Sequence, residues 1–292
     1  MAVLGPTATF REVREWYTRL AVLERQVCLI EAEDHRGVGT GFLVASDMVM
    51  TASHVIGFNG WSPKMLRARF GFMYRPEDKK TAKGETIDFV SNGMVVATSP
   101  VQELDVSILR LTANAGLKSA LGDDKPRGWV ELNNSSCQLE SGNPLAVLQH
   151  ANAGPLKLAL NTDSIVNLND GYLGRHRDDP AWQRRFLHRT DTLPGSSGAP
   201  CFDIEWNFAG IHQGRAPGDD FACNFGIPSA AVTDWIKSIG LWELFLKAPP
   251  SHDIFAFKST SYEADNMKLP ADVRARLNRR RTGARNKRNG VQ

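Results

Sequence analysis

Short apolar runs separated by turn-forming residues fill the middle of this sequence. Runs such as VCLIEA, GTGFLVA, MVMTAS and VSILRL recur between residues 27 and 228, and Gly, Asn, Asp and Pro separate them. Runs of this length that are rich in β-branched residues predict strands, and almost no long helical pattern lies among them. The sequence therefore predicts an all-β sandwich or a pair of barrels.

Two helical patterns flank this β-rich region. From Thr9 to about Gln26, apolar residues recur at helical spacing, and Thr7 or Thr9 can cap the predicted amphipathic helix. We expect its apolar stripe to pack on the outside of the β structure, in preference to binding a partner. The second pattern, SAAVTDWIKSIGLWELFL at residues 229–246, begins at Ser229, which can also act as an N-cap.

The C-terminal segment differs in composition from the rest. Pro249 and Pro250 open a polar stretch, and residues 268–292 hold nine Lys and Arg residues against one acidic residue. That region alone carries +8, whereas the formal charge of the whole chain is +3, so the remaining sequence is mildly acidic. Low apolar content and like charge predict a segment that is disordered or folds on a partner. Weak, salt-sensitive nucleic-acid contact is an expectation for residues 274–288.

Composition limits the class of protein. An apolar content of 42% in 292 residues is enough for a sizeable core. The N-terminal stretch has scattered charges and no uninterrupted apolar run, which predicts neither a signal peptide nor a membrane helix and favours a soluble, cytoplasmic protein. The cysteines lie far apart without CxxC pairs, so buried free thiols are favoured for Cys28, Cys137, Cys201 and Cys223.

No pattern predicts a metal ion or a cofactor. Five histidines show no metal-like spacing with one another or with cysteine: His35, His150, His176, His188 and His252. GVGTG at residues 37–41 superficially resembles a phosphate-binding loop, but the Lys and the helix that should follow are missing. We therefore expect neither a metal nor a cofactor.

Three strings supply the parts needed to hydrolyse an amide, which are a nucleophile, a base and donors for an oxyanion. The strongest is LPGSSGAPCFD at residues 193–203. Gly195 lets the backbone turn so that its N–H and that of Ser197 can point at one spot, and Gly198 leaves room for a substrate. Ser197 then lies beside a predicted oxyanion hole made by the N–H groups of Gly195 and Ser197.

The other two strings carry a candidate base and a carboxylate. In GTGFLVASDMVMTASHVI, residues 39–56, His54 follows a predicted hairpin that holds an imidazole on a short, rigid turn. In LDVSILRL, residues 104–111, Asp105 precedes an alternating strand. A buried carboxylate there can accept the Nδ1 proton of His54 and fix its tautomer. Each residue alone is more often structural, but the three strings occur together in the order His, Asp, Ser.

Together these strings resemble the trypsin-like or chymotrypsin-like serine peptidases, especially the bacterial branch that includes the glutamyl endopeptidases. TASHV resembles the histidine motif of that family, LDVSILRL the aspartate motif and TDTLPGSSGAPCFD the serine motif. The resemblance covers roughly residues 26–236. It implies two six-stranded antiparallel β-barrels that meet at a cleft, with His54 and Asp105 from the first barrel and Ser197 from the second.

The resemblance also implies boundaries and one departure. We expect an N-terminal helix at residues 1–26, a first barrel at 27–120, a second barrel with a C-terminal helix at 121–248, and a polar linker with the basic tail at 249–292. Ser196 stands where digestive members carry an aspartate that captures a new N-terminus, so activation by that route is not expected. By analogy with secreted relatives, a Cys137 to Cys201 disulfide is an alternative to free thiols.

Two features bear on which bond is cut, and they disagree. Asp191 lies six residues before Ser197, where trypsin has a carboxylate that selects Arg or Lys. GIHQG, which places His212 and Gly214 at the predicted pocket, resembles instead a glutamyl endopeptidase string, and Thr192 matches a threonine that binds acidic side chains there. An enzyme that cut after Arg would remove its own basic tail. For the substrate residue before the cut bond, we therefore place acidic or small uncharged residues slightly ahead of basic ones. Structural roles for Asp191 and His212 stay open.

Three functions remain open from the sequence. The first is a serine endopeptidase that forms an acyl-enzyme on protein or peptide substrates, with a regulatory role in the cytoplasm and, by analogy, in bacterial defence. An activating partner is compatible with this function. The second is a catalytically silent or latent trypsin-like fold that binds peptides. The third is a nucleic-acid-associated protein recruited by its basic tail, and none of the three involves a membrane.

Overall fold

The computed structural model describes residues 12–34, 36–57, 65–120, 125–132, 137, 139–166, 184–216, 223–247 and 249–250. The chain divides into two units, residues 1–252 and 253–292, and all of the described residues belong to the first. The predicted basic tail, the predicted helical residues before Glu12 and the histidines His35, His176 and His252 lie outside the described residues. The predicted boundary near residue 120 adjoins a stretch that is not described, so the domain ranges stay predictions.

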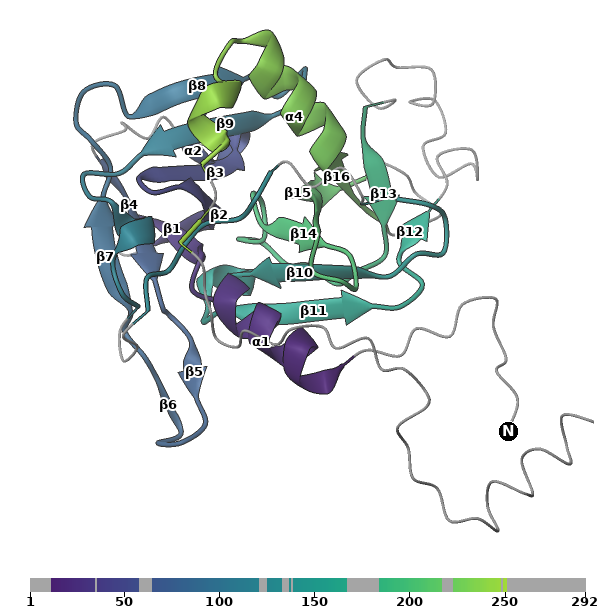
Figure 1. The fold of residues 1–292 in the computed structure, drawn as a ribbon, viewed down its shortest axis with the longest axis horizontal. Coiled ribbons are helices and arrows are strands. Elements are labelled where there is room, and N and C mark those ends of the chain that lie inside the picture. The colour runs from purple at the N-terminus through teal and green to yellow at the C-terminus, as the bar shows by residue number, and fades with distance from the viewer. Residues whose placement is uncertain are drawn as a thin grey trace, which may run out of the picture. The chain divides into compact units, whose positions relative to one another are not determined.

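Seven strand segments form the first sheet, in the order β7-β4-β1-β2-β3-β9-β8 (Figure 1). Their bounds are β1 (Val27–Ala32), β2 (Gly37–Ala45), β3 (Met48–Ala52), β4 (Leu66–Phe70), β7 (Glu85–Asp88), β8 (Val95–Ser99) and β9 (Val106–Arg110), and all neighbouring pairs are antiparallel. The end segments β7 and β8 follow each other along the chain, and a bridge between Phe89 and Leu111 places the end of β7 beside β9. The sheet therefore closes into a barrel of six strands, one of which is interrupted.

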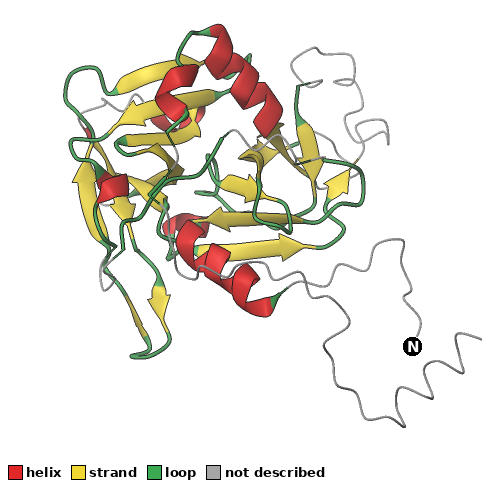
Figure 2. Ribbon diagram, viewed as in Figure 1, coloured by secondary structure: helices red, strands yellow, loops and turns green. Residues whose placement is uncertain are grey.

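The second sheet repeats this arrangement, in the order β11-β10-β14-β15-β16-β13-β12 (Figure 1). Figure 2 shows the strands in yellow and the helices in red. Its bounds are β10 (Leu145–Gln149), β11 (Lys157–Asn161), β12 (Ile165–Val166), β13 (Phe186–His188), β14 (Pro200–Phe202), β15 (Phe208–Arg215) and β16 (Asn224–Pro228). The end segments β11 and β12 are again consecutive in the chain. The expected chymotrypsin-like fold class is confirmed, with seven strand segments in each sheet where six strands were expected.

Some of these segments were not predicted from the sequence. β13 has only three residues, and the small hairpin of β5 (Tyr74–Arg75) and β6 (Lys80–Thr81) is exposed and polar, so neither makes an apolar run. The run RARFGFM at residues 67–73 is also typical of a strand, but β4 ends within it, at Phe70. Gly71 follows with φ +68°, a left-handed conformation that breaks the strand.

In each barrel, strands that face the other barrel are buried on both sides, which explains their continuous apolar runs. Phe42 lies in a core shared by the two barrels, whereas its neighbour Leu43 lies inside the first barrel. In the second barrel Leu148 belongs to the shared core and Val147 to the interior. Successive side chains of a strand point to opposite faces, so burial of both requires one apolar layer within each barrel and another between them.

The N-terminal helix α1 (Val13–Leu23) packs on the outside of the second barrel. Trp16 Nε1 donates to the carbonyl of Ile204 at 3.0 Å, and Trp206 Nε1 donates to the carbonyl of Trp16 at 3.0 Å. The two indole rings lie 4.7 Å apart between centroids. Reciprocal bonds from the two indoles fix the helix against the turn between β14 and β15, and Leu20 of its apolar stripe packs against the shared core.

The C-terminal helical pattern is divided in two. Helix α4 (Ser229–Ser238) is followed by the short 3₁₀ helix η7 (Trp242–Phe245), and Gly240 at φ +72° separates them. The predicted cap at Ser229 is wrong, because Pro228 occupies the N-cap position and no side chain caps the helix. Proline at that point fixes an extended φ, so the chain leaves β16 and enters the helix without a hydroxyl cap.

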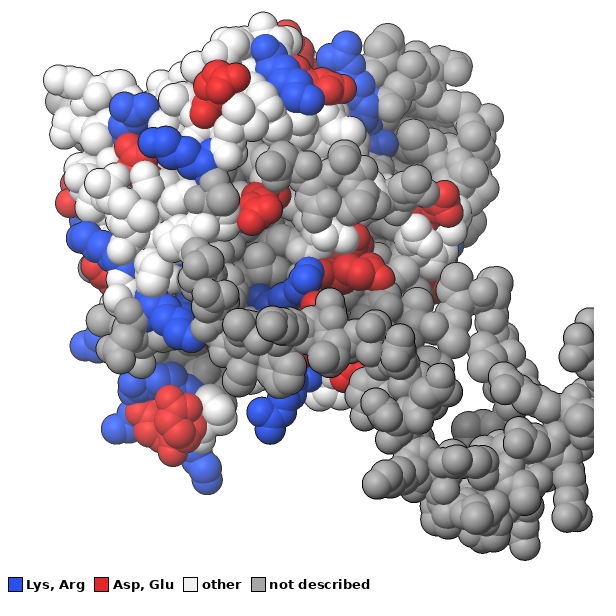
Figure 3. Space-filling model, viewed as in Figure 1, with Lys and Arg blue, Asp and Glu red and all other residues white. Residues whose placement is uncertain are grey.

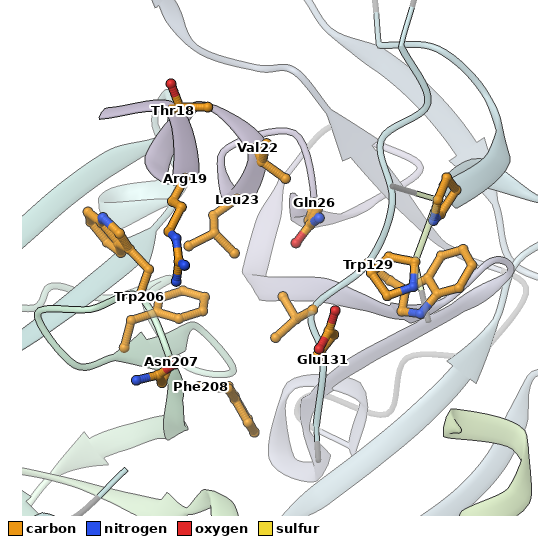
Figure 4. Close-up of a pocket in the computed structure, with 14 residues that line it drawn as sticks. Thr18, Arg19, Val22, Leu23, Gln26, Trp129, Glu131, Trp206, Asn207 and Phe208 are labelled. Carbon is orange, nitrogen blue, oxygen red and sulfur yellow. The ribbon is translucent and has the colours of Figure 1, made fainter. Parts of the chain in front are cut away.

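A pocket of about 580 Å³ lies beside α1, and none of the predicted site residues lines it (Figure 4). Arg19 and Leu23 of the helix face Trp206 and Phe208 across it, with Trp129 on the other side. On the face shown in Figure 3, Lys and Arg alternate with Asp and Glu over the described surface. No helix among the described residues is long and apolar enough to cross a membrane.

Candidate active site

The predicted base and carboxylate are in direct contact. His54 lies in the one-turn helix α2 (Ser53–Gly57), directly after β3, and its Nδ1 lies 2.7 Å from Oδ2 of Asp105. The main-chain N–H of His54 donates to Oδ1 of the same carboxylate at 2.8 Å, and Ser53 Oγ donates to Oδ1 at 2.6 Å. Because a carboxylate only accepts, Nδ1 carries the proton, and Nε2 is left as the acceptor that a general base needs.

Strand register places Asp105 beside that helix. β3 pairs with β9 so that Ala52 lies opposite Val106, which brings the residues after β3 next to the residue before β9. Asp105 is 3% exposed, and its φ of +55° is left-handed. Its main-chain carbonyl accepts the N–H of Ser53 at 3.1 Å. Both the side chain and the main chain of Asp105 are therefore held by the segment that carries His54.

The predicted nucleophile lies in a tight turn before β14. The N–H of Gly198 donates to the carbonyl of His212 at 2.8 Å, whereas the N–H groups of Gly195 and Ser197 donate to no acceptor in the described part of the chain. Gly195 has φ +93°, and a Cβ there would lie 2.7 Å from the carbonyl oxygen of His150. The turn therefore requires glycine, and it leaves unused the two donors that were predicted to form an oxyanion hole.

Thr40 of the first barrel anchors this turn. Its N–H donates to the carbonyl of Ser197 at 2.9 Å, and its Oγ1 donates to the carbonyl of Gly195 at 2.8 Å. The hydroxyl also accepts the N–H of His150 at 3.0 Å. Thr40 is fully buried, so these bonds are shielded from water. The nucleophile turn is thus positioned by the barrel that carries the base.

The hydroxyl of Ser197 does not face His54 in this conformation. Ser197 Oγ donates to the main-chain carbonyl of Gln213 at 2.9 Å, and a hydroxyl has one proton to donate. Rotation about χ1 is the motion that would bring the proton to Nε2 of His54. The structure therefore joins His54 and Asp105 directly and connects Ser197 to β15.

Asp191 and Thr192 lie in an open groove of about 670 Å³ along β11. Asp191 is exposed, and its main-chain carbonyl accepts Nε2 of Gln149 at 2.8 Å. Lys157 and Leu193 line the same groove. The carboxylate of Asp191 is therefore exposed to water, and its role in selecting a substrate side chain stays a prediction.

His212 is buried rather than open to solvent. Its Nδ1 lies 3.1 Å from Nε2 of His188, and the rings meet edge to face. Burial lowers the pKa of His188 to about 3. Burial also lowers the pKa of His212 well below its usual value, and the neighbouring imidazoles of His188 and His54 add to this lowering. Both rings are therefore neutral. Gly214 follows a bulge in β15 and lies beside Phe225. Its predicted role in a substrate pocket stays a prediction.

The four cysteines are free thiols, with Cys28, Cys201 and Cys223 buried. Burial, together with the nearby carboxylate of Asp203, raises the pKa of Cys137 to about 12. No group of three or more His, Cys, Asp and Glu that could hold a metal ion is found among the described residues.

Sequence reasoning missed two polar residues near the site, Gln213 and Arg185. Gln213 is 2% exposed and Arg185 is 8% exposed, and their side chains contact each other. Gln213 stands in the GIHQG string next to His212, but nothing in that string shows which way its amide points. Arg185 lies 28 residues earlier and precedes a strand too short to predict.

Two closed antiparallel barrels, with a histidine and a buried carboxylate on one and an accessible serine turn on the other, are the architecture of a chymotrypsin-like peptidase. Residues 39–211, more than half of the chain, match the family described as a trypsin-like peptidase domain. The chain belongs to that family. Its bacterial branch of glutamyl endopeptidases is not singled out by this match.

Solved structures share the fold at low sequence identity. The scabies mite inactivated protease paralogue S-I1 matches with a TM-score of 0.55 and 16% identity, covering 76% of this chain and 96% of that one. The active form of the Rv3671c protease from M. tuberculosis matches with a TM-score of 0.50 and 20% identity, covering 82% and 95%. At such identities the likeness concerns the fold alone.

One curated relative also matches, an uncharacterized protein, y4fB, from Sinorhizobium fredii. It is 25% identical over 197 residues, which is 66% of this chain and 28% of that protein. The chain therefore spans less than a third of the length of this relative.

Proposed function

We propose that this protein is a serine endopeptidase in which Ser197 is the nucleophile, His54 the general base and Asp105 the residue that orients His54. The observation that carries the proposal is the buried carboxylate of Asp105, which holds both the ring and the main chain of His54. Such a contact fixes the tautomer with Nε2 unprotonated and stabilises the imidazolium that forms later.

The proposed reaction begins with rotation of the Ser197 hydroxyl from Gln213 to Nε2 of His54. Oγ then attacks the carbonyl carbon of the peptide bond while Nε2 takes its proton, and the N–H groups of Gly195 and Ser197 stabilise the oxyanion. The imidazolium gives that proton to the leaving amine as the C–N bond breaks. Water, deprotonated by the same nitrogen, hydrolyses the resulting ester and restores Ser197.

For the residue before the cut bond, we propose acidic or small uncharged side chains ahead of Arg and Lys. Support comes from the exposed position of Asp191, since a carboxylate in an open groove is screened by water and selects a cation weakly. Neutral His212 offers a hydrogen bond but no charge to a substrate carboxylate. Small uncharged side chains are therefore the stronger part of this proposal.

A latent form of the same enzyme is the second candidate. The bond from Ser197 Oγ to Gln213 favours it, because the nucleophile is engaged before substrate arrives. A latent protease acting on few substrates fits the regulatory, cytoplasmic role, with bacterial defence as the proposed setting by analogy. Two other outcomes would replace the peptidase proposal. The protein would either bind a peptide without cleaving it or be recruited to nucleic acid by residues 274–288.

Labelling by a fluorophosphonate probe, together with cleavage of a peptide library that varies the residue before the cut bond, tests the proposal. Wild type should be labelled and should cut, Ser197→Ala should do neither, and Ser238→Ala, which alters an exposed serine at the end of α4, should match wild type. Labelling without cleavage would show a reactive serine whose preferred peptide is missing from the library. Absence of both in wild type would leave the latent form or a binding module.

A further inference from the structure

Gln213 occupies a β-bulge that turns its side chain toward the other barrel. In the pairing of β15 with β16, His212 lies opposite Gly226 and Gly214 opposite Phe225, so Gln213 is the extra residue. A bulge re-aims the side chain of the residue that it leaves unpaired. The amide of Gln213 accordingly reaches the turn that carries Asp105 rather than a neighbour on its own sheet.

The amide of Gln213 donates to two carbonyls of that turn. Nε2 lies 2.5 Å from the carbonyl oxygen of Leu104 and 3.3 Å from that of Asp105. The main-chain carbonyl of Gln213 meanwhile accepts the hydroxyl of Ser197. One residue of the second barrel therefore contacts the aspartate turn through its side chain and the nucleophile through its main chain.

Arg185 fixes which way this amide points. Its Nε donates to Oε1 of Gln213 at 3.2 Å, and its Nη2 lies 3.2 Å from the carbonyl of Val101 and 3.4 Å from that of Glu103. Arginine only donates, so Oε1 must face it and the NH₂ group must face the carbonyls of the turn. The guanidinium also stacks over the ring of Phe225 at 5.5 Å.

These contacts satisfy four main-chain carbonyls of one short turn. Residues 101, 103, 104 and 105 each direct a carbonyl at Arg185 or Gln213. Within the first barrel, the turn is also held by bonds from the N–H groups of Glu103 and Asp105 to the carbonyl of Pro100, from the N–H of Leu104 to Ser99 Oγ, and from the N–H of Ser53 to the carbonyl of Asp105. The left-handed backbone of Asp105 is strained for a residue with a Cβ. External donors are what keep such a conformation in place.

We propose that Gln213, held by Arg185, is a positioning residue that fixes the aspartate turn so that both carboxylate oxygens of Asp105 meet His54. The inference rests on the proposed function for its catalytic consequence, but the contact between Asp105 and His54 is measurable without catalysis. Nothing in the roles assigned to Ser197, His54 and Asp105 requires a glutamine or an arginine at these two places.

Two exchanges test the proposal in the full-length chain. Gln213→Met keeps the length of the side chain and removes both the donor and the acceptor, and Arg185→Met removes the clamp. Each should slow fluorophosphonate labelling of Ser197 by about 10- to 100-fold, the size of effect that small misplacement of catalytic groups produces. The loss should fall on kcat with little change in KM, because neither side chain contacts the substrate in this proposal.

The exchanges should also be non-additive. If the two residues act as one unit, the double variant loses no more than the worse single variant. Arg189→Met is the matched control, because Arg189 is an arginine close by whose ion pair with Asp163 lies at the surface. It should label at the wild-type rate.

A spectroscopic measurement separates this inference from the proposed function. In Ser197→Ala, which cannot react, the Nδ1–H proton of His54 bonded to Asp105 should give a far-downfield ¹H resonance, assigned by its loss in Asp105→Asn. Gln213→Met in that background should shift it upfield or abolish it, and Arg189→Met should not. If wild type proves inactive, this resonance still decides whether Gln213 positions Asp105.

Wild-type labelling rates and an unchanged resonance in both Met variants would overturn the proposal. If Gln213→Met does not fold, Gln213→Asn and Arg185→Lys take its place. Asn keeps the amide but not its reach, and Lys keeps the charge but not the fork, so each should show a partial loss. Wild-type behaviour of these two conservative variants would equally contradict the proposal.

Discussion

The two barrels place their proposed catalytic groups by different means. In the first, His54 and Asp105 lie at the ends of adjacent strands, β3 and β9, so ordinary sheet hydrogen bonds set their distance. In the second, Ser197 lies in a glycine turn that is held from outside by Thr40. The strands that carry His54 and Asp105 are therefore aligned by register within one barrel, with Gln213 of the second barrel bound to the turn before β9, whereas the turn of Ser197 is bound by Thr40 of the other barrel.

This difference teaches where the site is vulnerable. Register is specified by many bonds at once, so a single substitution seldom moves it. A crossing contact is one or two bonds, so removing a single hydroxyl or amide can shift the nucleophile without unfolding either barrel. The following experiments probe each side of the comparison.

The largest effect on kcat is expected from Asp105→Asn, which removes the carboxylate bonded to His54. An amide can offer its NH₂ group to Nδ1 and so stabilise the wrong tautomer of His54, and kcat should fall by about 10⁴-fold. The measurement is kcat for the best library peptide. Asp163→Asn, an exposed aspartate, is the control and should match wild type. A decrease of less than tenfold would mean that Asp105 does not orient the base.

The next effect concerns the stability of the first barrel. Glu31 on β1 is 1% exposed and binds Arg69 at 2.6 Å. Arg69→Met would leave its carboxylate buried without that partner, and the free energy of unfolding should fall by about 3 kcal/mol in a denaturant titration. Arg36→Met, which breaks an equally short pair at the surface, is the control and should change it little. Equal losses in the two variants would contradict the prediction.

A smaller effect is expected where the barrels cross. Thr40→Val keeps the shape of the side chain but removes the hydroxyl that bonds Gly195 and His150. Unfolding should become easier by about 1–3 kcal/mol because buried partners lose a bond. Labelling of Ser197 should also slow, since the turn that carries it is released. Thr112→Val, at an exposed threonine, is the control, and normal labelling of Thr40→Val would show that register alone suffices.

The smallest effect is a pH dependence of stability that arises in the second barrel. Burial holds the pKa of His188 at about 3, whereas an unfolded histidine titrates near its ordinary value of 6.5. The unfolded chain therefore binds the extra proton between these values, so stability is complete above pH 6.5 and declines as the pH falls toward 3. The slope is at most about 1.4 kcal/mol per pH unit for one group.

Comparison with His188→Gln measures that dependence. Unfolding free energies at pH 7 and pH 5 should differ less in the variant than in wild type, because a glutamine does not titrate. Burial lowers the pKa of His150 to about 4, so this residue should make a similar contribution to the pH dependence of stability. The exchange at His188 leaves that contribution unchanged. An identical pH dependence in wild type and variant would contradict the prediction.

The sequence allowed the fold class and the family resemblance of three strings to be predicted because each pattern is local. A hairpin that ends in TASHV and a strand that begins with LDVSI can be read from neighbouring residues. The contact between Arg185 and Gln213 cannot be predicted in this way, because it depends on a β-bulge that no local residue pattern indicates. The choice between Asp191 and His212 stayed open in the sequence for the same reason, because exposure and burial decide what each residue can bind.

The bond between Ser197 Oγ and Gln213 has a consequence for how this protein would respond to reagents of different size. A neutral hydrogen bond is worth about 1 kcal/mol net, and rotation of the hydroxyl to His54 exchanges this bond for another of the same kind. A small inhibitor must wait for that rotation, whereas a long peptide that binds next to β15 can compete for the carbonyl of Gln213 and release the serine as it arrives.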